Sequence, residues 1–330
     1  MTTINTILLT GAAGFIGAAT SKRLMDAGIR VIGIDNLNDY YALELKQLRL
    51  KQLHQYPAFT FHHVDISNYE ALTDCVLGEK IDGIVHLAAQ AGVRYSIEAP
   101  FAYANSNLVG HLSVLELARH AKKPPKIVYA SSSSVYGGNT KVPFSEADPV
   151  ENPVSLYAAT KRSCEILSQS YAKLYDLNQI GLRFFTVYGP LGRPDMAYWL
   201  FAEKILAGEE IPIFNHGDQE RDFTYIDDIT AGVCATILEP MKPIGETPHR
   251  IYNIGNNKPV RLLRFIEILE EALGTEARKR MEPMQPGDVK QTYADISQIS
   301  SDYGFSPRTP LEEGIPRFVE WFKDYRGNSA

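Results

Sequence analysis

The chain has 330 residues, of which 45% are hydrophobic and 22% are charged, an ordinary composition for a globular enzyme. Its 33 Lys and Arg residues against 39 Asp and Glu residues leave a net charge of −6, which excludes a broadly basic surface for nucleic acid or an anionic membrane. At this length we expect two domains, or one large domain with an appended lobe.

The sequence indicates neither a membrane segment nor a secretory leader. No segment has 18 or more consecutive apolar residues, and the first ten residues carry no charged leader. Cys75, Cys164 and Cys234 stand far apart without a CxxC pair, as expected in a reducing compartment. No metal site is expected, because the adjacent His62 and His63 would point to opposite faces of a strand. We therefore expect a cytoplasmic protein without membrane contacts.

Short β-branched runs alternate with helical stretches through the first half of the chain. The runs predict strands over residues 6–10, 30–35, 59–66, 83–89, 126–132 and 179–185. Apolar residues at helical spacing predict helices that include residues 15–27, 69–77, 107–120 and 157–175. The alternation predicts an α/β fold with a doubly wound parallel sheet. Beyond residue 188 the pattern breaks up and predicts a smaller C-terminal α/β lobe, with the chemistry in the cleft between the two.

The segment TGAAGFIG follows the first predicted strand and enters the first predicted helix. Glycines there permit a tight turn and a close approach of the backbone to a pyrophosphate, which the helix N-terminus also attracts. The turn residues expected to contact a dinucleotide are Gly11, Gly14, Phe15, Ile16 and Gly17. Asp35 ends the second strand, where a carboxylate accepts both ribose hydroxyls and repels a 2′-phosphate. The sequence therefore predicts a Rossmann domain that binds NAD rather than NADP.

Two further strand ends add weaker contacts to this expected dinucleotide site. Asp65 and Ile66 end the third predicted strand and would sit beside the adenine. Ala88 and Ala89 end the fourth strand and are small enough for the cofactor to lie against the backbone. For the two alanines, simple core packing is an equally good interpretation.

The segment YAATK sets Tyr157 and Lys161 four residues apart at the start of a predicted helix, and hence on one face. A neighbouring ammonium favours the phenolate, which makes a tyrosine a useful general base. Any helix can carry this pair by chance, so its position matters: it follows a strand that ends in ASSSSVYG. Ser132 and Ser134 would hydrogen-bond the same substrate oxygen, although a serine run can also be a linker.

Taken together, TGAAGFIG, HLAAQAGVRYS, SSSSVYG, YAATK, RFFTVYGPLGRPDMA and RDFTYIDD resemble the extended short-chain dehydrogenase/reductase family along almost the whole chain. Within that family of nucleotide-sugar enzymes, the chain most resembles the UDP-glucuronate 4-epimerases. The resemblance implies a tightly held NAD that removes hydride from C4, a 4-keto intermediate that rotates, and return of hydride to its other face. It implies that Tyr157 is the base, that Lys161 binds the cofactor ribose, and that Ser132 and Ser134 contact the 4-oxygen.

The same resemblance argues against two related reactions. In the 4,6-dehydratases the two positions after the first catalytic hydroxyl are typically Asp and Glu, and the decarboxylating relatives keep the Glu. Here those positions are Ser133 and Ser134. Without an acid to protonate a leaving hydroxyl, the 4-keto sugar can only be reduced again, so an epimerase is favoured.

The resemblance also assigns residues to the uridine diphosphate. Arg221 matches a diphosphate-binding arginine, although an ion pair with Asp222 or Asp227 is the alternative. Asp288 matches the residue that accepts from the uridine ribose. Many relatives carry a second diphosphate arginine nearby, whereas this chain has Gln285, as glucuronate-type members do.

The sugar and the uracil are assigned in the same way. Ile213 and Phe214 match the segment beside uracil, with a buried edge strand as the alternative. Thr186 resembles a hydroxyl that meets the hexose, and Arg193 resembles the residue that receives the C5 carboxylate, for which a guanidinium offers a matching fork. The remaining expected substrate contacts are Arg94 and Ser133.

These observations predict reversible conversion of UDP-glucuronate to UDP-galacturonate. Two alternatives remain open. The protein could be an epimerase of neutral UDP-hexoses, in which Arg193 is only a charged loop residue, or a non-catalytic NAD-binding regulator. We expect residues 1–178, with segments near 220–256 returning to them, to bind NAD, and residues 179–330 mainly to bind the UDP-sugar. The helices over residues 107–120 and 157–175 pair into a dimer contact in relatives, so a homodimer is expected.

Overall fold

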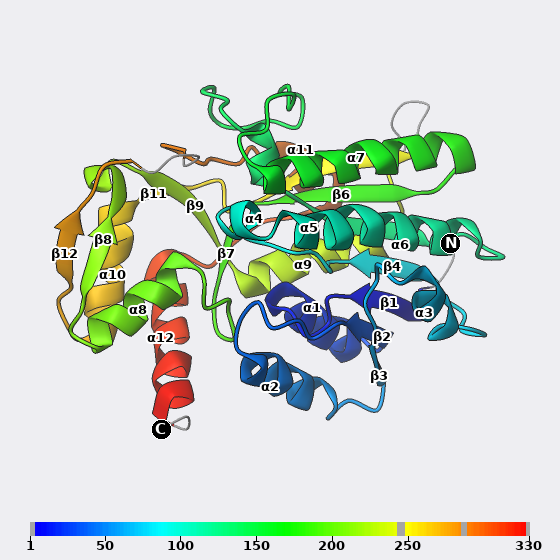
Figure 1. Ribbon diagram of the computed structural model, residues 1–330, viewed down its shortest axis with the longest axis horizontal. Helices are drawn as coiled ribbons and strands as arrows, with labels where there is room; N and C mark the ends of the chain where they lie inside the picture. The colour runs from blue at the N-terminus through cyan, green and yellow to red at the C-terminus, as the bar shows by residue number, and fades with distance from the viewer. Residues whose placement is uncertain (1–3, 243–247, 285–288, 328–330) are drawn as a thin grey trace.

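The computed structural model describes residues 4–242, 248–284 and 289–327. Its centre is a seven-stranded sheet in which every pair of neighbours is parallel (Figure 1). In spatial order the strands are β10 (His249–Ile254), β6 (Gln179–Phe184), β5 (Lys126–Ser132), β4 (Gly83–His86), β1 (Thr6–Thr10), β2 (Arg30–Asp35) and β3 (Phe59–His63). The predicted doubly wound Rossmann sheet is confirmed.

Helices cover both faces of this sheet because successive residues of a strand point to opposite sides. In β1, Ile7 and Leu9 join an apolar cluster with α1 (Phe15–Asp26) and α9 (Ile226–Leu238). Leu8 joins a second cluster, with α6 (Gly110–Arg119) and α7 (Leu156–Tyr175). The other helical segments of this half are α2 (Leu43–Leu53), α3 (Tyr69–Asp74), α4 (Tyr95–Glu98), α5 (Pro100–Tyr103), η1 (Ala104–Val109) and η2 (Ser133–Tyr136).

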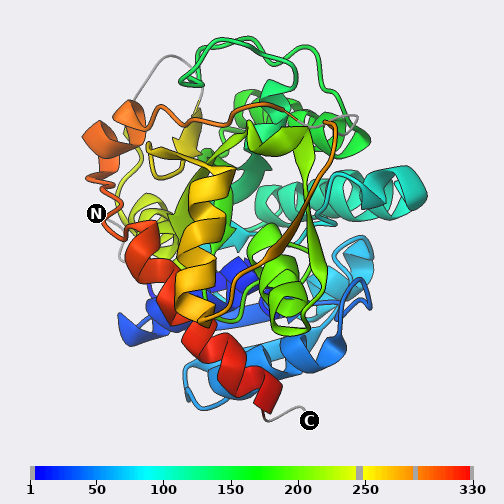
Figure 2. The same ribbon diagram turned by 90° about the vertical axis from the view of Figure 1, so that its left-hand side faces the viewer.

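A smaller lobe projects from the carboxyl ends of the strands, as Figures 1 and 2 show. One small sheet joins β11 (Pro259–Arg261), β9 (Glu220–Tyr225) and β7 (Thr186–Tyr188), and another joins β12 (Arg278–Met281) and β8 (Glu210–Ile213). Its helical segments are α8 (Ala197–Leu206), η3 (Phe214–Gly217), α10 (Leu262–Leu273) and α12 (Leu311–Gly327), while α11 (Ser297–Tyr303) contacts β10 of the main sheet. In the described part of the chain, no helix is both long and hydrophobic enough to traverse a bilayer.

Several predicted boundaries differ from the structure. The third strand ends at His63 instead of residue 66, because the Asp65 side chain accepts from the Ser67 backbone and turns the chain out of the sheet. The fourth ends at His86 instead of residue 89. The helix expected over residues 107–120 begins as the π-helical turn η1, and α2 was not among the predicted helices.

Residues 179–330 were expected mainly to bind the UDP-sugar, but β6, which begins at residue 179, pairs with both β5 and β10 inside the main sheet. The chain therefore leaves this sheet only after Phe184. Of the later segments expected to return to it, α9 and β10 do so, whereas β9 lies in the three-stranded sheet of the lobe.

Candidate active site

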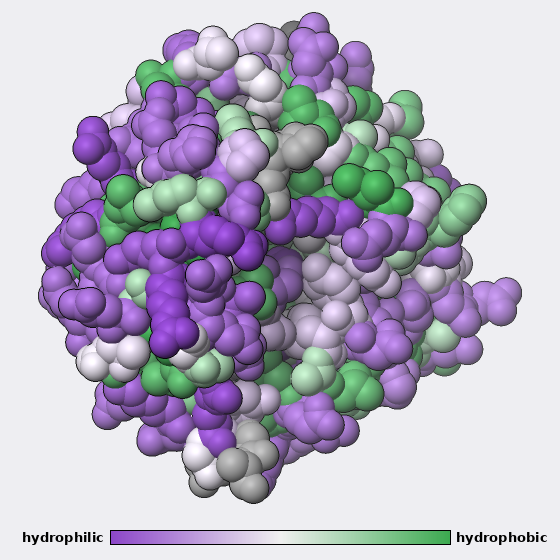
Figure 3. All heavy atoms as spheres, turned by 60° about the vertical axis from the view of Figure 1, so that its left-hand side comes forward, coloured by the Kyte–Doolittle hydropathy of each residue, from purple (hydrophilic) through white to green (hydrophobic). Residues whose placement is uncertain are grey.

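A cavity of about 830 Å³ runs along the carboxyl ends of the strands and is closed on its far side by the lobe. Figure 3 shows the molecule with the lobe side turned forward, and a hollow is visible near the centre of the view. The predicted residues that line this cavity are Gly11, Gly14, Phe15, Ile16, Gly17, Asp35, Ile66, Ala88, Ala89, Arg94, Ser132, Ser133, Ser134, Tyr157, Lys161, Thr186, Arg193, Phe214 and Arg221. Its size is in the range that suits a cofactor with a small substrate.

Three predicted residues are not among those that line the cavity. Asp65 accepts from the Asn36 amide at 2.8 Å and from the Ser67 hydroxyl at 2.7 Å. These hydrogen bonds outweigh the effect of burial and lower the pKa of the Asp65 carboxyl group. Ile213 is fully buried at the end of β8, as the edge-strand alternative expected. Asp288 lies outside the described residues.

The turn between β1 and α1 has room for nothing larger than glycine at two positions. Gly11 has a φ of +77°, and a Cβ there would lie 2.8 Å from the Ala88 nitrogen. A Cβ on Gly17 would lie 1.9 Å from the Gly11 carbonyl oxygen. The turn thus brings the N-terminus of α1 to the cavity with no side chain covering its backbone N–H groups. These groups are suited to bind a pyrophosphate.

Asp35 lies on the floor of this part of the cavity and is 8% exposed. Its Oδ2 accepts from the Ala13 backbone at 3.0 Å and its Oδ1 accepts from the Leu37 backbone at 2.9 Å. Each carboxylate oxygen has a second acceptor position, so Asp35 can still receive two ribose hydroxyls. The residues therefore fit a nicotinamide dinucleotide without a 2′-phosphate.

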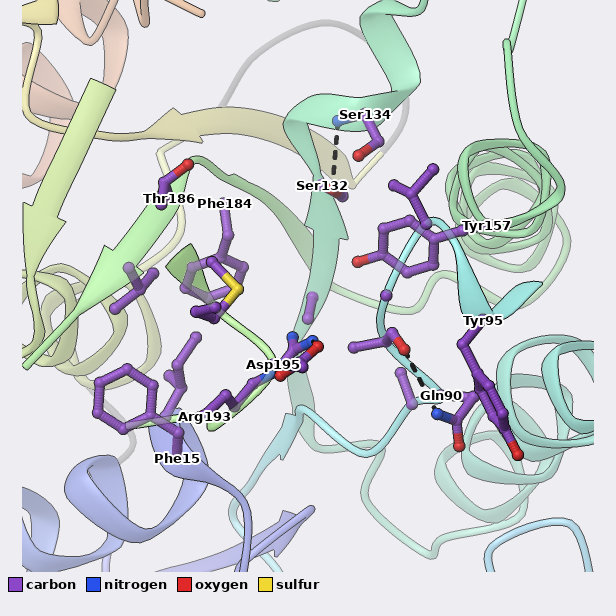
Figure 4. A pocket seen from close by; sticks show the side chains of 18 of the residues that line it. Phe15, Gln90, Tyr95, Ser132, Ser134, Tyr157, Phe184, Thr186, Arg193 and Asp195 are labelled. Atoms are coloured by element: carbon purple, nitrogen blue, oxygen red, sulfur yellow. Dashed lines mark hydrogen bonds and ion pairs between the residues drawn. The ribbon is translucent and has the colours of Figure 1, made fainter. Parts of the chain in front are cut away.

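The predicted catalytic groups meet at the end of β5 and the start of α7. Ser155 caps α7 by accepting from the Ala158 backbone at 3.1 Å, which fixes the first turn that carries Tyr157. One turn later, Lys161 is 4% exposed and donates from Nζ to the Ala130 carbonyl oxygen of β5 at 2.9 Å. In Figure 4 the Tyr157 hydroxyl points into the cavity below Ser132 and Ser134.

Arg193 comes from the loop after β7 and lies in the cavity with Tyr157 (Figure 4). Its Nε and Nη2 donate to Asp195 at 3.0 and 2.5 Å, and Tyr40 donates to the same carboxylate at 3.0 Å. Burial disfavours its charge, but Asp195 outweighs burial and raises the pKa of Arg193. Within the described residues Nη1 makes no hydrogen bond. The end-on face of the guanidinium, Nη1 with the second hydrogen of Nη2, is therefore available to another carboxylate.

Two more predicted cations lie at the lobe side of the cavity. Arg94 stacks over the ring of Phe214, 5.5 Å from its centroid, and so joins α4 to the lobe. Arg221 donates to the carbonyl oxygens of Glu220 and Lys290 at 2.9 and 3.2 Å. Asp222, one proposed ion-pair partner of Arg221, is fully buried and accepts from three backbone amides, those of residues 256, 257 and 294.

Sequence reasoning missed the residues that hold the site together. Tyr40 contacts Asp195, Arg49 contacts the loop before Arg193, and Glu165 of α7 binds Ser131 and Arg183. Glu165 lies one turn beyond Lys161 on the buried face of α7. A carboxylate at that position in the sequence could have been recognised as a candidate for a buried ion pair. Nothing in the sequence pattern indicated Arg49.

A family model, described as the NAD dependent epimerase/dehydratase family, matches residues 7–255. The chain belongs to this family. It is 47% identical to protein CapI of Staphylococcus aureus, over 97% of this chain and 98% of the relative. It is 45% identical to UDP-glucuronate 4-epimerase 4 of Arabidopsis thaliana, over 97% of this chain and 76% of the relative.

Among solved structures, the chain is similar to the UDP-glucuronic acid 4-epimerase of Bacillus cereus in complex with UDP-glucuronic acid and NAD. The TM-score is 0.87 and the identity 36%, and the match covers 97% of this chain and 99% of the other. The family's cofactor, NAD, agrees with the glycine turn and with Asp35. The expected resemblance to nucleotide-sugar epimerases is confirmed.

Proposed function

We propose that the protein interconverts UDP-glucuronate and UDP-galacturonate by epimerisation at C4, using NAD held by the β1–α1 turn. The observation that carries the proposal is Arg193, whose end-on face is open in the same cavity as Tyr157. A carboxylate that leaves water for a partly closed cavity needs a charged partner with matching hydrogen bonds. The two similar proteins named as UDP-glucuronate or UDP-glucuronic acid 4-epimerases support this substrate.

The residues at the end of β5 and the start of α7 perform the proton transfer. The Tyr157 phenolate accepts the proton of the C4 hydroxyl while Ser132 and Ser134 hydrogen-bond that oxygen. Bound NAD supplies a hydride acceptor, and afterwards a hydride donor, for the C4 carbon. One N–H group of Lys161 donates to the Ala130 carbonyl oxygen. The other two can donate to the cofactor ribose and stabilise the negative charge on the Tyr157 oxygen. Tyr157 then returns its proton to the same oxygen.

The absence of a free acid in the described lining supports re-reduction over elimination. The carboxylates that line the cavity there are Asp35 and Asp195. Asp35 is bound to backbone amides at the dinucleotide end, and Asp195 is bound to Arg193. Ser133 and Ser134 stand where an eliminating enzyme would need acids. Elimination of water from a 4-keto sugar would therefore find no free acid in the described lining to assist it.

The test is a comparison of UDP-glucuronate and UDP-glucose with the wild type and with Arg193→Ala. We expect the wild type to convert UDP-glucuronate, and the variant to lose about 100-fold in kcat/KM on it, because a charged hydrogen-bonded pair is lost. Binding of UDP-glucose should change less than tenfold. The assignment would be contradicted if the wild type preferred UDP-glucose, or if Arg193→Ala weakened both sugars equally. The similar proteins named above do not favour the alternative of a neutral-hexose epimerase.

The lobe supplies the groups for the uridine diphosphate in this proposal. Arg221 of β9 reaches the cavity and would bind the two phosphates. Phe214, under the guanidinium of Arg94, would lie against the uracil ring. The main domain would thus bind NAD and the lobe the nucleotide half of the substrate, with the hexose between them.

We further propose a homodimer that acts in the cytoplasm. The helical segments from α4 to α7 expose large apolar side chains, namely Ile97, Phe101, Val109, Leu112, Ile166 and Leu174. Apolar groups spread over neighbouring helices are typical of an interface. Light scattering should give twice the chain mass, and a monomer at micromolar concentration would contradict this. The cytoplasm is supported by three free cysteines.

A further inference from the structure

Arg49 on α2 is 1% exposed, and all five of its N–H groups donate hydrogen bonds. Nε and Nη2 donate to the Leu191 carbonyl oxygen at 3.0 and 2.7 Å, and Nη2 also donates to that of Gly192 at 2.8 Å. Nη1 donates to the Ala13 carbonyl oxygen at 3.0 Å and to the Tyr41 hydroxyl at 2.6 Å. Because a guanidinium has five donors, none is left over.

The two carbonyls at one end of Arg49 immediately precede Arg193. The backbone there is unusual, since Leu191 has a φ of +59°, a left-handed value that non-glycine residues rarely adopt. At Arg193 itself the backbone N–H donates to the Tyr198 hydroxyl at 3.0 Å. Gly192 has no room for a side chain, because a Cβ would lie 2.0 Å from that hydroxyl. Arg49 and Tyr198 together fix the direction in which Arg193 leaves the chain.

The carbonyl at the other end of Arg49 belongs to the dinucleotide turn. Ala13 lies between Gly11 and Gly14, and its own N–H donates to Asp35 at 3.0 Å. One guanidinium therefore joins the turn expected to hold the pyrophosphate to the loop that carries Arg193. Figure 1 shows the loop after β7 descending to α1 and α2, where this contact is made.

The described partners of Arg49 are all neutral oxygen atoms. A buried cation that is held by carbonyls and a hydroxyl is stable only if its hydrogen bonds are well made. Lysine would keep the charge, but its three donors radiate from one nitrogen and cannot reach Ala13 and Gly192 at once. The shape of the guanidinium, and not its charge alone, is what this position uses.

We infer that Arg49 is a positioning residue that aims Arg193 at the sugar carboxylate and so sets the preference for a uronate. The inference rests on the proposed function. It predicts that changing Arg49 alters the discrimination between UDP-glucuronate and UDP-glucose, although Arg49 touches neither sugar.

The experiment compares Arg49→Lys, Arg193→Ala and the double variant, each loaded with NAD. Calorimetry gives the Kd of UDP-glucuronate and of UDP-glucose, and turnover gives kcat/KM for UDP-glucuronate. We expect Arg49→Lys to weaken UDP-glucuronate about tenfold to 100-fold more than UDP-glucose, since a displacement near 1 Å costs this much. The double variant should be no worse on UDP-glucuronate than Arg193→Ala, because both changes remove one interaction. Lys51→Ala, exposed on the same helix, is the control and should match the wild type.

Equal weakening of both sugars by Arg49→Lys, or full additivity with Arg193→Ala, would overturn the inference. Tyr41→Phe removes only one of the five hydrogen bonds of Arg49 and should produce a smaller shift in the same direction, which keeps the test decisive if Arg49→Lys folds poorly.

A second measurement separates this inference from the proposed function. If Arg193→Ala weakens both sugars equally, the carboxylate assignment fails, and hydrogen exchange then decides the positioning role. Arg49→Lys should speed exchange at least tenfold in the peptide over residues 189–196 and leave α7 unchanged. Unchanged exchange in the 189–196 peptide would refute the positioning role.

Discussion

Two walls of the cavity are built by different means. The catalytic wall consists of Ser132, Ser134, Tyr157 and Lys161, on a strand and a helix that pack against each other. The carboxylate wall is the loop over residues 189–195, whose backbone has left-handed and glycine-only conformations. Regular secondary structure therefore holds the reacting groups. Arg193, the residue proposed to bind the sugar carboxylate, is instead held by a few hydrogen bonds, some of them from side chains distant in the sequence.

Each wall has its own buried arginine. In the catalytic wall, Arg183 of β6 forms a two-pronged ion pair with Glu165 of α7 at 2.8 and 2.9 Å, and Glu165 also accepts from Ser131 at 2.6 Å. In the carboxylate wall, the partners of Arg49 among the described residues are all neutral oxygens. The Arg183–Glu165 ion pair joins the helix to the sheet, whereas Arg49 holds the loop through hydrogen bonds to uncharged oxygens.

The largest effect is expected when the catalytic wall loses its base. Tyr157→Phe removes the only group proposed to accept the C4 proton and should lower kcat about 1,000-fold or more. The Kd of UDP-glucuronate should stay within threefold, because Arg193 and the lobe are untouched. Chromatography of UDP-glucuronate and UDP-galacturonate measures turnover. Turnover within tenfold of the wild type would show that another residue is the base.

Stability should depend most on Glu165. Burial opposes its ionisation, but hydrogen bonds from Arg183, Ser131 and Arg162 outweigh burial and lower the pKa of its carboxyl group. Glu165→Gln leaves Arg183 buried without a counter-charge and should cost about 3 kcal/mol in the free energy of unfolding, measured in urea. Glu267→Gln, in an exposed ion pair with Arg264, should cost less than about 0.5 kcal/mol. Similar losses in both would mean that the catalytic wall does not depend on this pair.

The sequence predicted the catalytic wall well because its residues follow regular elements. Strands were predicted with the observed bounds at β1, β2 and β5, and Tyr157 and Lys161 were predicted on one helix face. Helical and strand periodicity come from burial, which a sequence reports directly. Boundaries failed where a side chain, such as that of Asp65, replaced the sheet's hydrogen bonds with local ones.

The carboxylate wall was only half predictable. Arg193 itself was singled out, and its pairing with Asp195, two residues away, needs only local geometry. Arg49 was invisible because its partners at Leu191 and Gly192 are backbone carbonyls 142 and 143 residues distant. Every residue has a carbonyl, so no side-chain pattern marks the ones that a buried arginine binds.

A smaller effect should follow from loosening the loop at its other support. Tyr198→Phe leaves the Arg193 backbone N–H without its acceptor and removes little volume. The free energy of unfolding should fall by about 1 kcal/mol, while the Kd of UDP-glucuronate rises more than that of UDP-glucose. Glu165→Gln, in contrast, should not change the ratio of the two Kd values. A change in that ratio for Glu165→Gln alone would reverse the division of roles between the walls.

The smallest effect concerns acid stability of the carboxylate wall. Burial opposes ionisation of Asp195, but Arg193 and Tyr40 outweigh it and hold the pKa of the Asp195 carboxyl group below its ordinary value of 3.8. A group whose pKa is depressed on folding adds stability that is full above its unfolded pKa and disappears as pH falls through the folded one. The pair is about one-quarter exposed, so Asp195→Asn should cost about 1 kcal/mol or less between about pH 5 and 8. In urea unfolding, this difference from the wild type should shrink below pH 3.8. A difference that stays constant or grows in acid would show that Asp195 holds the loop by hydrogen bonding rather than by charge.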